Sequence, residues 1–148
     1  MVDVADKPAT VREALAECII KMAPDTLRAV KSGTAAKGDA IQVARVAGIM
    51  AAKRTSELIP LCHPLPLTSV TLDFDFVPGA VRVLARARVV GQTGVEMEAL
   101  TAAAVAGLTL IDMTKGIERG VSIESVRLLE KSGGRSGTWK RATAKAKR

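Results

Sequence analysis

The chain has 148 residues, enough for one domain with a substantial core, and 48% of them are apolar, which excludes disorder for most of its length. Its two cysteines are too few for a disulfide framework. The net charge of +7 falls to +2 without the last nine residues, "KRATAKAKR". The remainder is therefore nearly neutral. With two Phe, one Trp and no Tyr to stack on bases, nucleic acid is not an expected partner.

Residues 1–139 are expected to form a single domain, and residues 140–148 a disordered basic tail. The start, "MVDVADKPAT", lacks the apolar stretch of a signal peptide. The uncharged run Ala99 to Ile111 is too short to span a bilayer. We therefore expect a cytoplasmic protein without a membrane partner.

The first third of the chain contains one ambiguous segment and two helices. Residues 11–22, "VREALAECIIKM", fit a strand or a helix. "APDTLRAVKSG" predicts a short helix, because Pro24 suits a first position and Gly33 suits the residue after the end. Residues 39–57 predict a longer, buried helix capped by Asp39.

The middle of the chain predicts a β-hairpin. Residues 70–76, "VTLDFDF", and residues 81–89, "VRVLARARV", both alternate apolar and polar side chains around the turn "VPGA". Asp73 and Asp75 are expected near the arginines of the second strand, and cross-strand pairing is the favoured interpretation of those arginines.

The last third predicts a helix and a strand. Thr93 and Glu96 fit a T-x-x-E capping box, so the helix is expected to start near Gly94 and to end near Gly116. Residues 121–131 read as a strand. The order of elements is then strand, two helices, two strands, helix, strand. It predicts an α+β fold, a ferredoxin-like sandwich with helices packed on one face of an antiparallel sheet.

Two carboxylates stand near the ends of the uncharged helix. Glu98 and Asp112 are fourteen residues apart, which places them on one face but roughly 21 Å apart along the axis. One small substrate can hardly touch both, so we hypothesise an active site shared between two subunits. Helix-end charge effects explain Lys115 and, in part, Glu98, but they disfavour Asp112.

The only histidine lies in "LIPLCHPLPL". Pro60, Pro64 and Pro66 stiffen the backbone around His63, which suits a side chain held for recognition. The alternative is an imidazole hydrogen-bonded in the core. One histidine beside one cysteine is too few for a metal site, and none is expected.

Several cations flank glycines or helix ends. Lys37 precedes a glycine, Lys53 ends a helix, and Lys131 and Arg135 belong to the glycine-rich "LLEKSGGRSG". Such loops expose backbone N–H groups and let cations approach phosphate. Taken singly, each lysine reads as a solvated surface charge.

Three stretches, "KGDAIQVARVAGIMAAKRTSELIPLCHPLPL", "GVEMEALTAAAVAGLTLIDMTKG" and "VRLLEKSGGRSG", together resemble the cyclic pyranopterin monophosphate synthase (molybdenum cofactor biosynthesis protein C) family. The resemblance covers almost the whole chain. It implies a catalytic ferredoxin-like domain, a homohexamer built as a trimer of dimers, and active sites at a dimer interface. The implied reaction converts 3′,8-cyclo-7,8-dihydro-GTP to cyclic pyranopterin monophosphate with release of pyrophosphate. No resident cofactor is implied, and Mg²⁺ with the triphosphate stays open.

The resemblance also resolves residues 11–22 as a strand and assigns the site. Asp112 and Lys115 are the implied catalytic, proton-transferring pair. His63 and Glu98 are expected to hold the base or sugar. The implied substrate-binding residues are Leu61, Cys62, His63, Glu96, Met97, Glu98 and, for phosphate, Arg12, Lys37, Lys53 and Lys131.

Two departures from the family pattern are visible. Thr34, Ala35 and Ala36 stand where histidines are common, and Arg135 stands where lysine is common. The alternative function is a non-catalytic nucleotide- or nucleic-acid-binding module that uses the basic tail.

Overall fold

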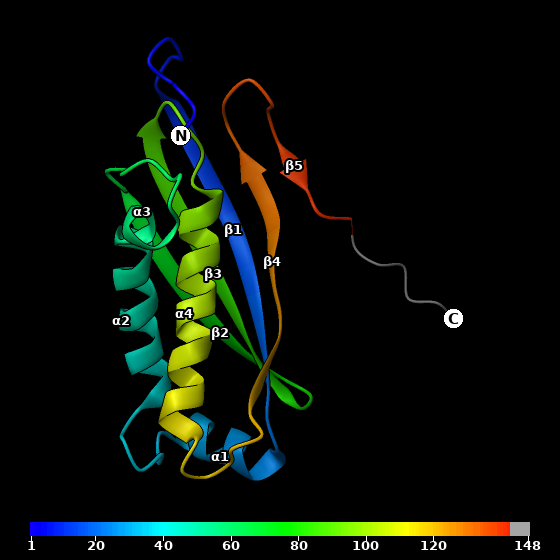
Figure 1. The fold of residues 1–148 in the computed structure, drawn as a ribbon. Helices are drawn as coiled ribbons and strands as arrows, with labels where there is room; N and C mark the ends of the chain where they lie inside the picture. The colour runs from blue at the N-terminus through cyan, green and yellow to red at the C-terminus, as the bar shows by residue number, and fades with distance from the viewer. Residues whose placement is uncertain (143–148) are drawn as a thin grey trace.

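The computed structural model describes residues 1–142 and forms a five-stranded antiparallel sheet in the order β2-β3-β1-β4-β5, with helices on one face (Figure 1). This arrangement confirms the predicted α+β, ferredoxin-like class. The strands are β1 (Thr10–Lys21), β2 (Ser69–Val77), β3 (Ala80–Gly91), β4 (Ser122–Ser132) and β5 (Trp139–Lys140). The helices are α1 (Pro24–Ser32), α2 (Ala40–Lys53), α3 (Thr55–Leu58) and α4 (Glu96–Thr114).

Small side chains let the two long helices approach the sheet and each other. The ambiguous segment is the central strand β1, and its alternate residues Ala14, Ala16, Cys18 and Ile20 are buried under α4. A Cβ at Gly107 of α4 would lie 2.8 Å from the Cys18 sulfur, so only glycine allows this close packing. The segment forms a strand rather than a helix because it pairs with β3 on one edge and β4 on the other, which buries this apolar face.

Helix α4 is long and apolar enough to cross a membrane by length and composition, and it is the one such helix in residues 1–142. More than half of its apolar window is buried within the protein, where it packs on the sheet and α2. These contacts make α4 the core helix of a folded domain.

Two predicted element boundaries change, and one predicted cap is confirmed. The Asp39 cap is confirmed, because its carboxylate accepts hydrogen bonds from the N–H groups of Ile41 and Gln42, both at 3.1 Å. The long helix, however, breaks at Arg54 and continues as α3. The predicted capping box is wrong: α4 starts at Glu96, and the residue before it, Val95, makes no side-chain capping hydrogen bond. A Cβ at Gly94 would overlap the Glu96 carboxylate.

The end of the chain contains a strand that sequence patterning missed. Glycines with positive φ, among them Gly133 and Gly134, turn the chain after β4 so that β5 pairs with it. Lys140, which the sequence assigned to the tail, is part of this strand. The rest of the tail from residue 143 lies outside the described residues.

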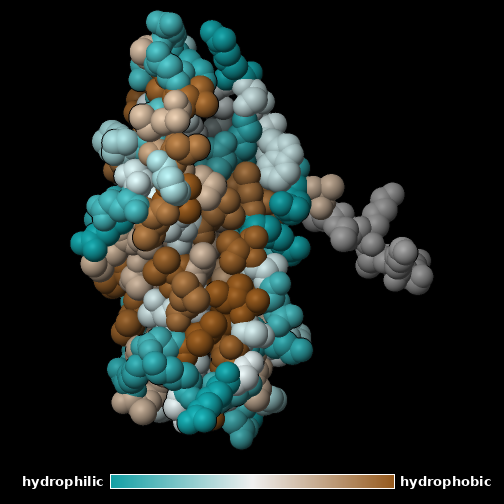
Figure 2. All heavy atoms as spheres, viewed as in Figure 1, coloured by the Kyte–Doolittle hydropathy of each residue, from teal (hydrophilic) through white to brown (hydrophobic). Residues whose placement is uncertain are grey.

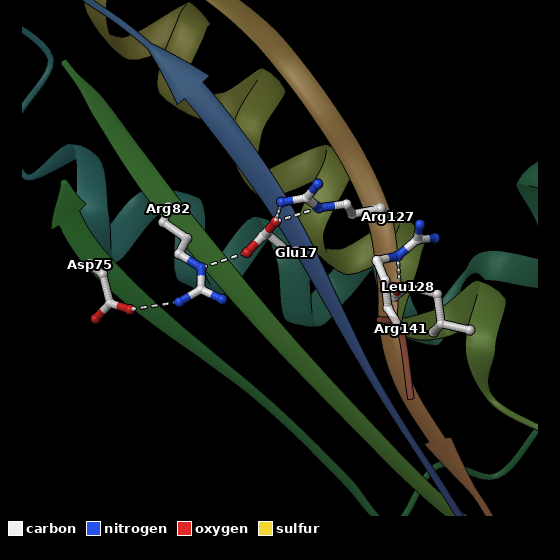
Figure 3. Close-up of polar contacts among 6 residues, drawn as sticks. All are labelled: Glu17, Asp75, Arg82, Arg127, Leu128 and Arg141. Carbon is white, nitrogen blue, oxygen red and sulfur yellow. Dashed lines mark hydrogen bonds and ion pairs between the residues drawn. The ribbon is translucent and has the colours of Figure 1, made fainter. Parts of the chain in front are cut away.

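The sheet face away from the helices carries a ladder of charges (Figure 3). Glu17 of β1 is 3% exposed and accepts hydrogen bonds from Arg82 of β3 at 2.5 Å and Arg127 of β4 at 2.7 Å. The predicted pairing of hairpin aspartates with arginines holds for Asp75, whose carboxylate lies 3.9 Å from Arg82. Arg86 instead pairs with Glu13 of β1.

Candidate functional site

The predicted substrate-binding residues of the proline-rich turn and of the first turn of α4 line one cavity. It has a volume of about 450 Å³ and lies at the upper end of the sheet in Figure 1, where α4 begins. The N-terminal segment closes it through Val2, Val4 and Lys7. We call it the α4 pocket; the predicted residues that line it are Leu61, Cys62, His63, Glu96, Met97 and Glu98.

His63 lines this pocket and a neighbouring cavity beside Pro64 and Pro66, and it is not part of the hydrophobic core. Its side chain is half-buried and makes no hydrogen bond to any other part of residues 1–142. The adjacent turn is held by the Cys62 N–H, which donates to the Ile59 carbonyl at 3.1 Å. The interpretation as a satisfied core histidine is therefore not supported, and the imidazole is available to a ligand.

Glu98 and Cys62 share an apolar environment in the α4 pocket. Burial raises the pKa of the Glu98 carboxyl, with a smaller contribution from the Glu96 charge. Burial also raises the pKa of the Cys62 thiol, and the nearby Glu98 carboxylate adds to this. Cys62 is thus a neutral thiol at physiological pH, which suits packing against a ligand better than nucleophilic attack. Glu98 can both donate and accept hydrogen bonds over a wider pH range than an exposed carboxylate.

A second pocket of about 420 Å³ lies beside the start of β1 and is lined by three cationic side chains, Lys7, Arg12 and Arg135. We call it the cation pocket. The Arg12 Nε donates to the Gly91 carbonyl at 2.9 Å, which fixes the guanidinium at the end of β1. A Cβ at Gly134 would overlap that guanidinium, so a side chain there would have to displace it, and the φ of +72° also favours glycine.

The other predicted phosphate ligands lie outside these two pockets. Lys131 precedes the glycine-rich loop, and its ammonium group donates to the Ser136 hydroxyl. Lys53 ends α2 and is exposed, and neither residue belongs to either lining. Both cations lie at the same end of the molecule as the pockets (Figure 1).

Asp112 sits at the opposite end of α4, with two lysines. Its carboxylate pairs with Lys115 at 2.6 Å and with Lys37 at 2.7 Å. Hydrogen bonds from Lys115 and Lys37 lower the pKa of Asp112 to about 2. We call these three residues the lysine–aspartate cluster. The structure thus joins Lys37 to the predicted catalytic pair but separates all three from the α4 pocket of the same chain.

Sequence reasoning missed the contribution of the N-terminal segment. Lys7 and Thr10 line the cation pocket, and Lys7 also lines the α4 pocket. A single lysine in a polar stretch carries no pattern, and its position beside Pro8 was the only local signal. Within residues 1–142 no three His, Cys, Asp or Glu side chains lie close enough together to hold a metal ion.

The fold and the site define a small α+β protein with a partly apolar cavity next to a cationic one, an arrangement suited to a phosphorylated small molecule. The sequence model of the MoaC family matches residues 1–134, and the chain belongs to this family. It is 56% identical over 149 residues to the cyclic pyranopterin monophosphate synthase of Thermomicrobium roseum. That match covers 99% of this chain and 90% of the relative.

Proposed function

We propose that the protein is a cyclic pyranopterin monophosphate synthase, a cytoplasmic lyase that acts in molybdenum cofactor biosynthesis. Its substrate is 3′,8-cyclo-7,8-dihydro-GTP, and its products are cyclic pyranopterin monophosphate and pyrophosphate. Family membership and the 56% identical synthase support this assignment. The observation that carries it on structural grounds is the α4 pocket beside a pocket with three cations, which fits a base joined to a triphosphate.

The two pockets divide recognition between them. His63 and Glu98 in the α4 pocket offer hydrogen bonds to the nitrogen and oxygen atoms of the base, and Leu61 and Met97 supply apolar contacts. Arg12 offers charge-assisted hydrogen bonds to phosphate oxygens, which are stronger than neutral ones. Holding both ends of the substrate places a ribose hydroxyl for attack on the α-phosphate, from which pyrophosphate leaves.

The lysine–aspartate cluster supplies proton transfer and charge stabilisation. The low pKa of Asp112 makes its carboxylate a poor proton acceptor while both lysines contact it. Asp112 therefore orients the two ammonium groups, and Lys115, one helical turn away, is the group that delivers a proton. This sharpens the expectation that the pair shares proton movement, with Lys37 as a further member.

The catalytic unit in this proposal is a dimer within a homohexamer. In one chain the α4 pocket and the lysine–aspartate cluster lie at opposite ends of α4, roughly 21 Å apart along its axis. A second, antiparallel copy would bring its cluster to the first copy's pocket. Brown, apolar side chains cover the middle of the helical face in Figure 2. Exposed apolar residues on α2 and α4 support burial of this face: Val43, Val46, Met50 and Leu108.

The test is incubation of the purified chain with 3′,8-cyclo-7,8-dihydro-GTP, with and without Mg²⁺, followed by detection of pyrophosphate and a pterin. We expect one equivalent of each product per substrate. A chain ending at residue 142 keeps β5 and removes the last six residues. The synthase should retain its turnover in that form, whereas a nucleic-acid-binding module should lose its affinity. Absence of both products from the full chain would contradict the proposal.

A further inference from the structure

The N-terminal segment, residues 2–10, connects the two pockets. Val2 and Val4 line the α4 pocket, Pro8 and Thr10 line the cation pocket, and Lys7 lines both. We propose that Lys7 is a substrate-positioning residue that binds the phosphate chain where it passes from one pocket to the other. This inference rests on the proposed function, because it assigns a further ligand to the same substrate.

The segment is held in a defined conformation. The Lys7 N–H donates to the Val4 carbonyl at 3.0 Å, and the Ala5 N–H donates to the Asp3 carboxylate at 2.9 Å. The Gln92 side-chain amide, in the loop between β3 and α4, donates to the Ala5 carbonyl at 3.1 Å. These bonds fix the backbone on both sides of Lys7 and attach it to the body of the protein. A cation on a fixed backbone loses less entropy on binding than one on a free end.

The electrostatic setting favours an anion on the cation-pocket side of Lys7, whereas Glu96 and Glu98 line the α4 pocket on its other side. The cation pocket contains Lys7, Arg12 and Arg135 but no carboxylate among its lining residues. No carboxylate lies within salt-bridge distance of Lys7 in residues 1–142, so its charge is not neutralised by the described part of the chain. A phosphate oxygen would pair with the Lys7 ammonium group through a charge-assisted hydrogen bond.

The position of Lys7 also distinguishes it from Arg12. Arg12 and Arg135 line only the cation pocket, whereas Lys7 is the single cation that lines both. The α-phosphate lies nearest the sugar, and the terminal phosphates lie farthest from it. We therefore assign Lys7 to the phosphate nearest the sugar, and Arg12 and Arg135 to the pyrophosphate that leaves.

The experiment compares Lys7→Ala, Lys7→Arg and Lys21→Ala. Lys21 is the matched control, because it is an exposed lysine at the far end of β1, the strand that follows the N-terminal segment. Titration with inorganic tripolyphosphate should show about tenfold weaker binding to Lys7→Ala than to the wild type. The KM for the cyclised GTP substrate should rise by about the same factor, with a smaller change in kcat. Lys7→Arg should recover most of both.

A second variant tests the positioning of the segment. Gln92→Ala removes the hydrogen bond to Ala5 without changing any charge, and we expect about threefold weaker tripolyphosphate binding. The thermal midpoint of each variant is measured to show that the fold persists. Unchanged tripolyphosphate binding by Lys7→Ala, an equal loss in Lys21→Ala, or no binding by the wild type would each overturn the inference.

The outcomes separate this inference from the proposed function. If the wild type turns over substrate and Lys7→Ala has normal KM and tripolyphosphate affinity, the role of Lys7 fails and the synthase assignment stands. If the wild type forms no pterin but Lys7→Ala loses tripolyphosphate affinity, the anion site stands and the synthase assignment fails.

Discussion

The two ends of α4 hold the same chemical group in opposite environments. Glu98, near the start, is 4% exposed, and burial raises its pKa. Asp112, near the end, is half-exposed, and two lysines lower its pKa to about 2. At one end burial disfavours the charged form of the carboxyl, and at the other end two ammonium groups favour it.

Under the proposed mechanism, neither end of α4 is a complete site by itself. The α4 pocket holds groups for recognition, but Lys37 and Lys115, the lysines proposed for proton transfer, are not among its lining residues. The lysine–aspartate cluster holds charge but none of the residues of the α4 pocket. The proposed dimer resolves this because each of its two sites would combine one end from each copy.

The largest expected effect comes from two variants, each of which inactivates one end of α4. Asp112→Asn frees the Lys115 and Lys37 ammonium groups, and Glu98→Gln removes an ionisable carboxyl that binds the base. Each variant should fold normally and lose about a hundredfold or more in turnover, because each removes a group that positions the reaction. Co-assembled at equal amounts, they should recover about a quarter of wild-type activity, because half of the dimers are mixed and half of their sites are intact. Turnover is measured by pyrophosphate release.

The control is a mixture of Asp112→Asn with Lys115→Ala, two changes within the same cluster. No mixed dimer then contains an intact site, so activity should stay at the level of the single variants. Equal recovery in both mixtures would show that the two ends do not act across subunits.

The next prediction separates the effect of burial on a carboxyl from the effect of charge pairing. Glu98 and Asp112 differ in both, so they cannot separate the two. Glu17 is buried as Glu98 is, yet its pKa is lowered: burial opposes ionisation, but Arg82 and Arg127 outweigh it. Glu17→Gln should lower the free energy of unfolding by about 2 kcal/mol at neutral pH, less than for a fully buried pair because both arginines are partly exposed. Urea unfolding measures this at several pH values.

The direction of the Glu17 pKa shift predicts how this difference in unfolding free energy changes with pH. The folded-state pKa of Glu17 lies below its ordinary value of 4.5, so its contribution is fully present above 4.5 and is lost as the pH falls through the folded pKa. The difference between wild type and Glu17→Gln should therefore narrow in acid. A difference that stays constant would mean that the variant acts through packing. Turnover near neutral pH should change little, because the ladder lies on the sheet face away from the helices (Figure 3).

Features that depend on neighbours in the chain could be predicted from the sequence, and features that depend on tertiary packing could not. Alternation predicted the hairpin strands β2 and β3, and Asp39 was predicted as a helix cap, because these features depend on neighbours in the chain. The strand β1 was ambiguous from its residues and was resolved only by the family resemblance. The strand β5 was missed because its pairing depends on a glycine turn whose direction no periodicity encodes. The residues that the resemblance assigns to the proline-rich turn and the start of α4 lie together in the α4 pocket. The separation of Lys37 from that pocket and the position of Lys7 depend on tertiary packing.

The smallest expected effect concerns the glycine loop after β4, which contacts Arg12. Gly134 has a φ of +72°, and a Cβ there would overlap the Arg12 guanidinium. Gly137 has a φ of +60°, and nothing lies within 4 Å of a Cβ built there. Alanine at either position should lower the free energy of unfolding by about 1 kcal/mol, since both backbones are left-handed.

Only Gly134→Ala should also displace Arg12, and we expect its KM to rise about threefold to fivefold, a partial loss of one charge-assisted hydrogen bond. Gly137→Ala should keep the wild-type KM, because it carries the backbone penalty without the contact. Steady-state kinetics on both variants, with thermal unfolding alongside, separates the two contributions. Equal KM changes would mean that the loop acts through its stability. A wild-type KM in Gly134→Ala would place the phosphate away from Arg12 and leave Lys7 and Arg135 as its ligands in the cation pocket.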